Sequence, residues 1–142
     1  MNVELFKDAI AIIAGIPDER LSLGEWQCDD MLGFKVVRKP KKIKCHTIAC
    51  AGGWLALHPT MREHGLRPSP VDGAPILKDG GLYQDPFEAL ATLFDISEKE
   101  ATKLFTYRDW DGSERTDRQV WLKRAYKLLA KYEAKRERQQ TS

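Results

Sequence analysis

The sequence has few cysteines and no long hydrophobic run, and these absences argue against several classes of protein. The three cysteines lack the spacing of a disulfide framework, which is typical of thiols in a reducing compartment. No stretch approaches the roughly 18 apolar residues that span a bilayer. The first apolar run, residues 9–16, follows two acidic residues instead of the basic region of a signal peptide. We therefore expect a cytoplasmic protein without a membrane-spanning segment.

Catalytic signatures are missing as well. The sequence contains no phosphate-binding glycine loop and no Ser-His-Asp pattern. Two carboxylate pairs, Asp29–Asp30 and Asp109–Asp111, have the residue types of a Mg²⁺ or acid–base site, but turns and helix caps explain them more simply. We therefore expect a protein that is not an enzyme and that has no cofactor.

The length of 142 residues corresponds to one domain, with 42% hydrophobic and 31% charged residues. A chain of this size buries roughly two-thirds of the surface that its unfolded form exposes, so it can fold without a metal or a disulfide. We predict a mainly α fold: a single compact multi-helix domain over residues 1–138, with one or two minor β-hairpins. A frayed polar tail is expected at 139–142.

Four segments carry the signals of helices. Residues 3–14 place apolar side chains at helical spacing and end at a glycine and a proline. Asp85-Pro86 supplies a side-chain cap and a first-turn proline for a second helix. Two capping boxes follow, Ser97–Glu100 and Thr116–Gln119, and the second opens the longest helix, which is predicted to run to about Arg138.

The middle of the chain mixes helix and turn signals. We expect Thr47 to cap a buried helix that contains Trp54, and Pro59 to begin a short helix. Two glycines inside the first of these helices cost about 1 kcal/mol each relative to alanine, so close packing should compensate. Ile76–Lys78 and Leu82–Tyr83 flank an Asp-Gly-Gly turn, which predicts a two-stranded hairpin.

Basic residues are concentrated in two stretches of an otherwise acidic chain. Residues 31–44 hold six basic side chains and no acidic one, and from residue 114 onward nine basic residues accompany four acidic ones. We predict that the first stretch binds a partner; its basic residues are Lys35, Arg38, Lys39, Lys41, Lys42 and Lys44. The second stretch places Lys123, Arg124, Lys127, Lys131, Lys135 and Arg136 on the last predicted helix. Both stretches suit phosphate contacts, although no known nucleic-acid-binding motif accompanies them.

Cysteines and histidines in the middle of the chain raise two further alternatives. Cys45, Cys50, His58 and His64 have the residue types of a zinc site, but their spacing matches no common finger. On one continuous helix Cys50 and His58 would lie about 12 Å apart, which is too far for one ion. A thiol enzyme centred on Cys45, His46 and Cys50 is the second alternative, because helix-start amides acidify thiols. Since free cysteines are most often small buried hydrophobes, we expect no metal.

The run Cys45-His-Thr-Ile-Ala-Cys50-Ala-Gly-Gly-Trp54 resembles the motif Cys-Gly-Thr-x-x-Cys-x-Ala-Gly-Trp of a group of small proteins from phages, prophages and bacteria. The resemblance loosely covers residues 3–130, because residues 91–105 are similar to a downstream Leu-Gly-Leu-x-x-x-x-Ala-x-x-Leu-Phe block of that group. The sequence departs from the motif at His46 and Gly52. The resemblance transfers no activity or catalytic residue, but it implies a phage or prophage origin and an accessory role on host machinery.

These observations lead to one expectation and two alternatives. We expect a non-enzymatic, phage-derived binding protein of the bacterial cytoplasm that docks on a host protein or nucleoprotein complex and modulates or inhibits it, for example a defence system. The first alternative is a nucleic-acid-binding protein that uses the 35–44 stretch and the C-terminal helix. The second is a Cys/His metalloprotein or thiol enzyme.

Overall fold

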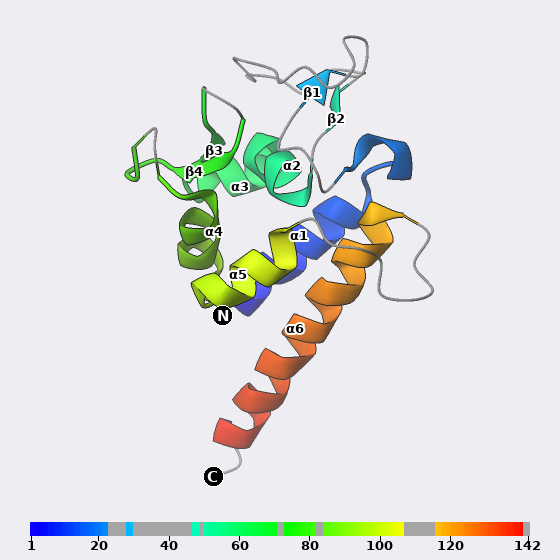
Figure 1. The fold of residues 1–142 in the computed structure, drawn as a ribbon. Coiled ribbons are helices and arrows are strands. Elements are labelled where there is room, and N and C mark those ends of the chain that lie inside the picture. The colour runs from blue at the N-terminus through cyan, green and yellow to red at the C-terminus, as the bar shows by residue number, and fades with distance from the viewer. Residues whose placement is uncertain are drawn as a thin grey trace.

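The computed structural model describes residues 1–22, 50–70, 73–81, 84–106 and 116–140, together with the backbone of residues 28–29 and 47–48. Within these residues the chain is mainly helical, with two small two-stranded antiparallel sheets (Figure 1). The predicted fold class is therefore confirmed. One cluster of buried apolar side chains, drawn mainly from α1, α2, α4, α5 and α6, forms the core and also includes Met61 and Leu66.

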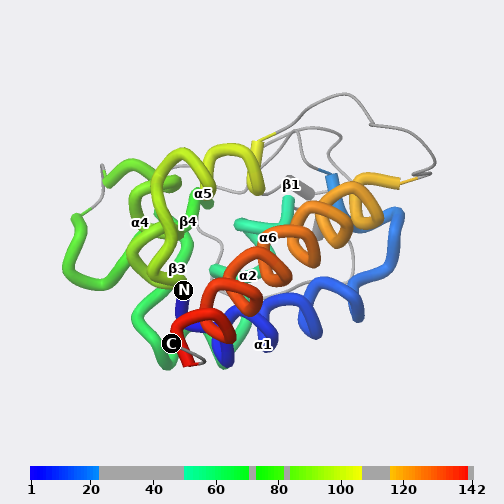
Figure 2. The backbone as a smooth tube through the Cα atoms, turned by 90° about the horizontal axis from the view of Figure 1, so that it is seen from below, coloured from blue at the N-terminus to red at the C-terminus, as the bar shows by residue number. Residues whose placement is uncertain are grey.

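Helix α1 (Val3–Ala14) and helix α6 (Asp117–Gln140) lie side by side, as Figures 1 and 2 both show. α1 begins where the sequence predicts, and the side chain of Asn2 caps it by accepting a hydrogen bond from the Leu5 amide at 3.2 Å. Phe6 of α1 is fully buried and packs edge-on against Phe94, with ring centroids 5.4 Å apart. This aromatic pair joins α1 to α4.

Helices α4 (Pro86–Phe94) and α5 (Glu98–Phe105) confirm two of the predicted caps. The Asp85 side chain accepts from the Phe87 amide at 2.8 Å. The Ser97–Glu100 capping box is complete, because each side chain accepts a hydrogen bond of 3.0 Å from the backbone amide of the other residue. Between the two helices, Asp95 adopts a left-handed conformation with φ of 53°.

The predicted cap at Thr47 is wrong. Thr47–Ile48 forms strand β2, which pairs with β1 (Cys28–Asp29), and helix α2 (Ala51–Leu57) begins three residues after β2 ends. The cap is Cys50, whose Sγ accepts from the Gly53 amide at 3.4 Å. All seven residues of α2 are buried, which explains the small side chains at its start. As predicted, Pro59 begins the short helix α3 (Pro59–Glu63).

The predicted hairpin has a different partner strand. Ile76 and Leu77 do lie in a strand, β4 (Pro75–Leu77), but β4 pairs with β3 (Leu66–Pro68) in antiparallel register. Leu82–Tyr83, the predicted partner, lies outside the described residues. Gly65 lies just before β3 and Gly73 lies in the connection between β3 and β4; their positive φ values of 94° and 79° allow the chain to turn at both places.

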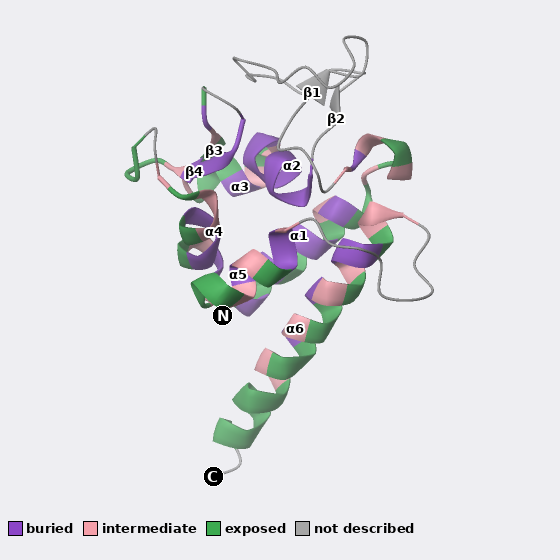
Figure 3. Cartoon of the chain, in the orientation of Figure 1, coloured by how far each residue is buried: buried purple, intermediate pink, exposed green. Residues whose placement is uncertain are grey.

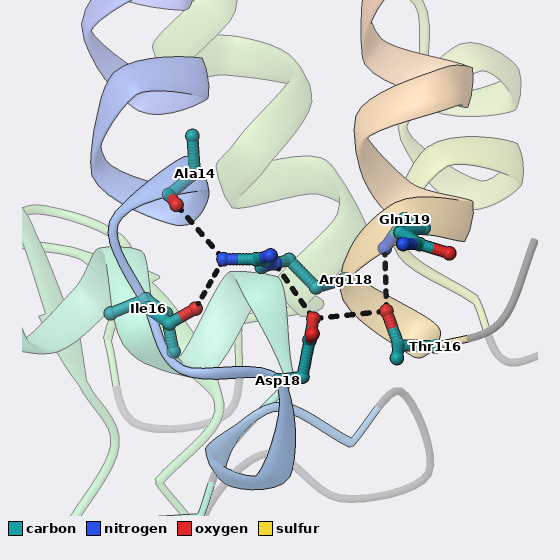
Figure 4. A network of polar contacts seen from close by, with 6 residues as sticks. All are labelled: Ala14, Ile16, Asp18, Thr116, Arg118 and Gln119. Atoms are coloured by element: carbon teal, nitrogen blue, oxygen red, sulfur yellow. Dashed lines mark hydrogen bonds and ion pairs between the residues drawn. The ribbon is translucent and has the colours of Figure 1, made fainter.

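A polar network joins the end of α1 to the start of α6 (Figure 4). Nη1 of Arg118 donates to the carbonyls of Ala14 and Ile16, both at 3.0 Å. Its Nε lies 2.8 Å from Oδ1 of Asp18, which belongs to the 3₁₀ turn η1 (Asp18–Arg20). Thr116 donates to the same carboxylate at 3.0 Å and accepts from the amide of Gln119. This last bond is the Thr116 half of the second predicted capping box.

Helix α6 ends at Gln140, two residues beyond the predicted end, in a run of good helix formers. Its buried residues, Val120, Trp121, Ala125 and Leu129, all precede residue 130. Its C-terminal turns are exposed and project from the helical body (Figure 3). None of the described helices combines the length and apolarity needed to cross a membrane.

Candidate functional site

Two of the sequence-predicted sites fall partly or wholly outside the described residues. The whole 35–44 basic run lies there, as do Cys45 and His46. The prediction that this run binds a partner, and the thiol-enzyme alternative, therefore stay predictions.

The remaining candidate metal ligands are placed, and the structure gives two of them other tasks. Cys50 is 2% exposed and caps α2. His58 caps α3, because its Nδ1 accepts from the Thr60 amide at 3.2 Å. His64 is exposed at the end of α3. Among the described residues, no three His, Cys, Asp or Glu side chains lie together as metal ligands.

A cleft between α5 and α6 is the best candidate for a functional site. It encloses about 350 Å³, and its lining residues are Ser97, Lys99, Glu100, Lys103, Lys131, Tyr132 and Lys135. Four of the seven are lysines, and Glu100 is the one carboxylate among these lining residues. The cleft therefore carries a net positive charge, which suits an anionic ligand.

The floor of the cleft is built around the carboxylate of Glu100, whose side chain is 15% exposed. Its Oε1 accepts from the Tyr132 hydroxyl at 2.5 Å and from the Ser97 amide at 3.0 Å, and its Oε2 pairs with Nζ of Lys131 at 3.0 Å. Burial raises the pKa of Glu100, but the hydrogen bonds from Tyr132, Ser97 and Lys131 outweigh it and lower this pKa from 4.5 to about 2. Burial and the neighbouring carboxylate raise the pKa of Tyr132 to about 12.

The rim of the cleft continues into a row of cations along α6. Lysines recur there at intervals of four residues, so successive ones lie about 6 Å apart along a row that winds slowly around the helix. On α5, two further lysines four residues apart border the opposite side of the cleft. All six side chains are exposed. We call this set the basic face: Lys99, Lys103, Lys123, Lys127, Lys131 and Lys135.

Acidic residues of α6 lie away from the cleft. Glu133 faces α1, where its carboxylate lies 4.0 Å from Nζ of Lys7. Arg124, which neighbours the row, is held against α5 because its Nη1 donates to the Thr106 carbonyl at 2.9 Å. The residues of α6 that line the cleft are Lys131, Tyr132 and Lys135, and none of these is acidic.

Sequence reasoning found only the α6 half of this site. Lys131 and Lys135 belong to the basic stretch predicted for the last helix, whereas Lys99 and Lys103 were not singled out. The signal for the second pair was their four-residue spacing just after the Ser97 cap, which places both on one side of a helix. That this side faces α6 depends on tertiary packing.

Comparisons with known proteins identified no relative of this chain. The chain matches no protein-family model, no curated protein and no solved structure among those with which it was compared. The chemistry of the cleft and of the basic face therefore carries the functional argument.

Proposed function

We propose that this chain is a non-enzymatic binding protein that docks through the basic face on a host protein or nucleoprotein complex and modulates or inhibits it. The observation that carries the proposal is the convergence of Lys99 and Lys103 of α5 with Lys131 and Lys135 of α6 around one cleft. Lys131 is paired with Glu100, and the other three lysines leave the cleft with a net positive charge that an anionic partner would balance. The phage origin and the cytoplasm of a bacterial host as its location rest on the sequence alone.

The protonation chemistry of the cleft favours binding over acid–base catalysis. A general acid or base works best when its pKa lies near the working pH. Hydrogen bonds from Tyr132, Ser97 and Lys131 lower the pKa of Glu100 to about 2 against the effect of burial. Burial and the Glu100 carboxylate raise the pKa of Tyr132 to about 12, so both pKa values lie far from neutral pH. At neutral pH the carboxylate stays ionised and the phenol stays protonated, so both groups act as fixed structural charges and dipoles.

A pull-down from bacterial lysate with matched charge reversals tests the proposal. The cleft variant carries Lys103→Glu and Lys135→Glu, and the control carries Arg62→Glu and Lys78→Glu, which change the charge equally on exposed residues of α3 and just after β4. We expect the cleft variant to recover partners about ten-fold less than the wild type, and the control to match the wild type. Melting curves confirm that both variants fold. Equal recovery by folded cleft variant and control would overturn the proposal.

A further inference from the structure

We infer that the basic face binds the phosphate backbone of double-stranded nucleic acid without reading the base sequence. One strand would enter the cleft between Lys99 and Lys103 of α5 and Lys131 and Lys135 of α6, and would then follow the row on α6 toward Lys127 and Lys123. The inference rests on the proposed function, because it takes the basic face as the docking surface, and it adds the chemical class of the ligand.

The spacing of the lysines suits a phosphate backbone. From Lys123 to Lys135 the row on α6 extends about 18 Å, with one cation about every 6 Å. Along one strand of a duplex a phosphate recurs about every 3.4 Å of helix axis, so successive lysines can each contact about every second phosphate. Flexible lysine stems can absorb the remaining mismatch. Lys99 and Lys103 add charge from the other side of the cleft.

The composition of the face favours nucleic acid over an acidic protein. Protein interfaces have apolar or aromatic anchors at their centre and are depleted in lysine. The basic face consists of lysines, and its cleft is lined by an ion pair between Lys131 and Glu100 and by one aromatic residue, Tyr132, whose hydroxyl is bonded to Glu100. Phosphate contacts need only positive charge on flexible side chains.

The side chains of the basic face also favour a duplex over a single strand, and contacts with phosphate over recognition of the bases. Single-strand binders stack bases on exposed aromatic rings. Tyr132, the one aromatic residue among the described residues that line the cleft, has its hydroxyl bound to Glu100 and the Nζ of Lys131 at 5.9 Å from its ring centroid. Tyr126 of α6 is 56% exposed but is not among the residues that line the cleft. Base edges are read by paired hydrogen bonds, from Arg or Lys to guanine and from Asn or Gln to adenine. The basic face contains no Arg, Asn or Gln, and its lysines are flexible point charges that suit contacts with phosphate.

Fluorescence anisotropy of the full chain with labelled duplexes of about 20 base pairs tests the inference, across about 50–300 mM NaCl. We expect two unrelated sequences to bind with affinities within about two-fold of each other. Replacing Lys103 and Lys135 by Gln should reduce the slope of log K against log salt by about 1.8, at 0.9 per phosphate contact. The matched control, Arg62→Gln with Lys78→Gln, should leave the slope unchanged. Lys131 is kept in both variants because its removal would leave the Glu100 carboxylate without its ion pair.

Three results would overturn the inference: no salt-dependent binding of duplex, equal slopes for the cleft variant and the control, or tighter binding of the corresponding single strand. A lysate pull-down with and without nuclease distinguishes failure of the nucleic-acid inference from failure of the proposed function. Recovery that depends on Lys103 and Lys135 but survives nuclease would keep the proposed function and assign the face to an acidic protein. Recovery that is lost both with nuclease and with the charge reversal supports the inference.

Discussion

The hydroxyl of Tyr132 donates a hydrogen bond of 2.5 Å to Oε1 of Glu100 and so links α6 to α5 at the floor of the cleft. The same carboxylate completes the cap of α5 through the Ser97 amide and pairs with Lys131. One side chain therefore caps a helix, joins two helices and sets the charge beneath the basic face. The stability of the helix pair and the electrostatics of the cleft depend on the same group.

The first prediction concerns acid stability. The pKa of Glu100 is about 2 in the folded chain, against 4.5 for an unperturbed group. Its stabilising contribution is therefore fully present above pH 4.5 and is lost as the pH falls from 4.5 toward 2. With an allowance for solvent screening, we expect about 1–2 kcal/mol from this group. Urea unfolding across this range should show a shallower loss of stability for Glu100→Gln than for the wild type. Parallel curves would contradict the assignment.

The second prediction concerns Tyr132, whose pKa is raised to about 12. Because the folded state holds the phenol protonated, this contribution is present below pH 10 and is lost as the pH rises from 10 to 12. Tyr132→Phe should lower the free energy of unfolding at neutral pH by about 1–2 kcal/mol, since it removes a hydrogen bond to a charged group. Tyr126→Phe is the matched control, because Tyr126 is 56% exposed on the same helix. A similar small effect of both substitutions would refute the role of the hydroxyl.

The third prediction concerns Arg118, which holds the end of α1 against the start of α6 (Figure 4). Arg118→Met keeps much of the aliphatic stem but removes the donors to two carbonyls and the ion pair with Asp18. We expect a loss of about 2 kcal/mol in the free energy of unfolding. Arg136→Met, at an exposed position of α6, should change it by less than about 0.5 kcal/mol. Chemical denaturation of both variants decides whether the network contributes as expected.

The fourth prediction separates a structural from a chemical role of Cys50. In a chain whose other two cysteines are replaced by serine, a thiol reagent should label Cys50 slowly, because the side chain is 2% exposed. Cys50→Ala removes the acceptor of the Gly53 amide and should cost about 1 kcal/mol more than Cys50→Ser, which keeps an acceptor. Rapid labelling of the native protein would instead favour the thiol-enzyme alternative.

Helix starts were largely predictable from the sequence because short-range bonds decide them. The Asp85 cap and the Ser97–Glu100 box each join residues no more than three positions apart. Both partners of each hydrogen bond can therefore be recognised within one short stretch of sequence. Apolar spacing likewise predicted the bounds of α1.

Distant segments compete with such local signals at two places. Thr47 has the residue type of a cap, but pairing of β2 with β1, about twenty residues earlier, makes it part of a strand and moves the cap to Cys50. In the hairpin, β4 pairs with β3 on its N-terminal side. The residues that join these two strands include the pair Asp72-Gly73, a turn signal of the same kind as Asp79-Gly80-Gly81, and Gly73 has a positive φ. Local signals alone therefore did not decide which of the two turns connects paired strands.

The sequence by itself determined the helical class, the positions of most caps and the basic character of the last helix, because periodicity and capping depend on neighbours within a few residues. Only the tertiary structure decided that lysines of α5 face lysines of α6 across a cleft. Glu100 and Tyr132 are 32 positions apart, and burial of Phe105 against Trp121, with ring centroids 5.8 Å apart, helps to bring their helices together. Such packing depends on how whole apolar faces fit, which no local pattern of residues encodes.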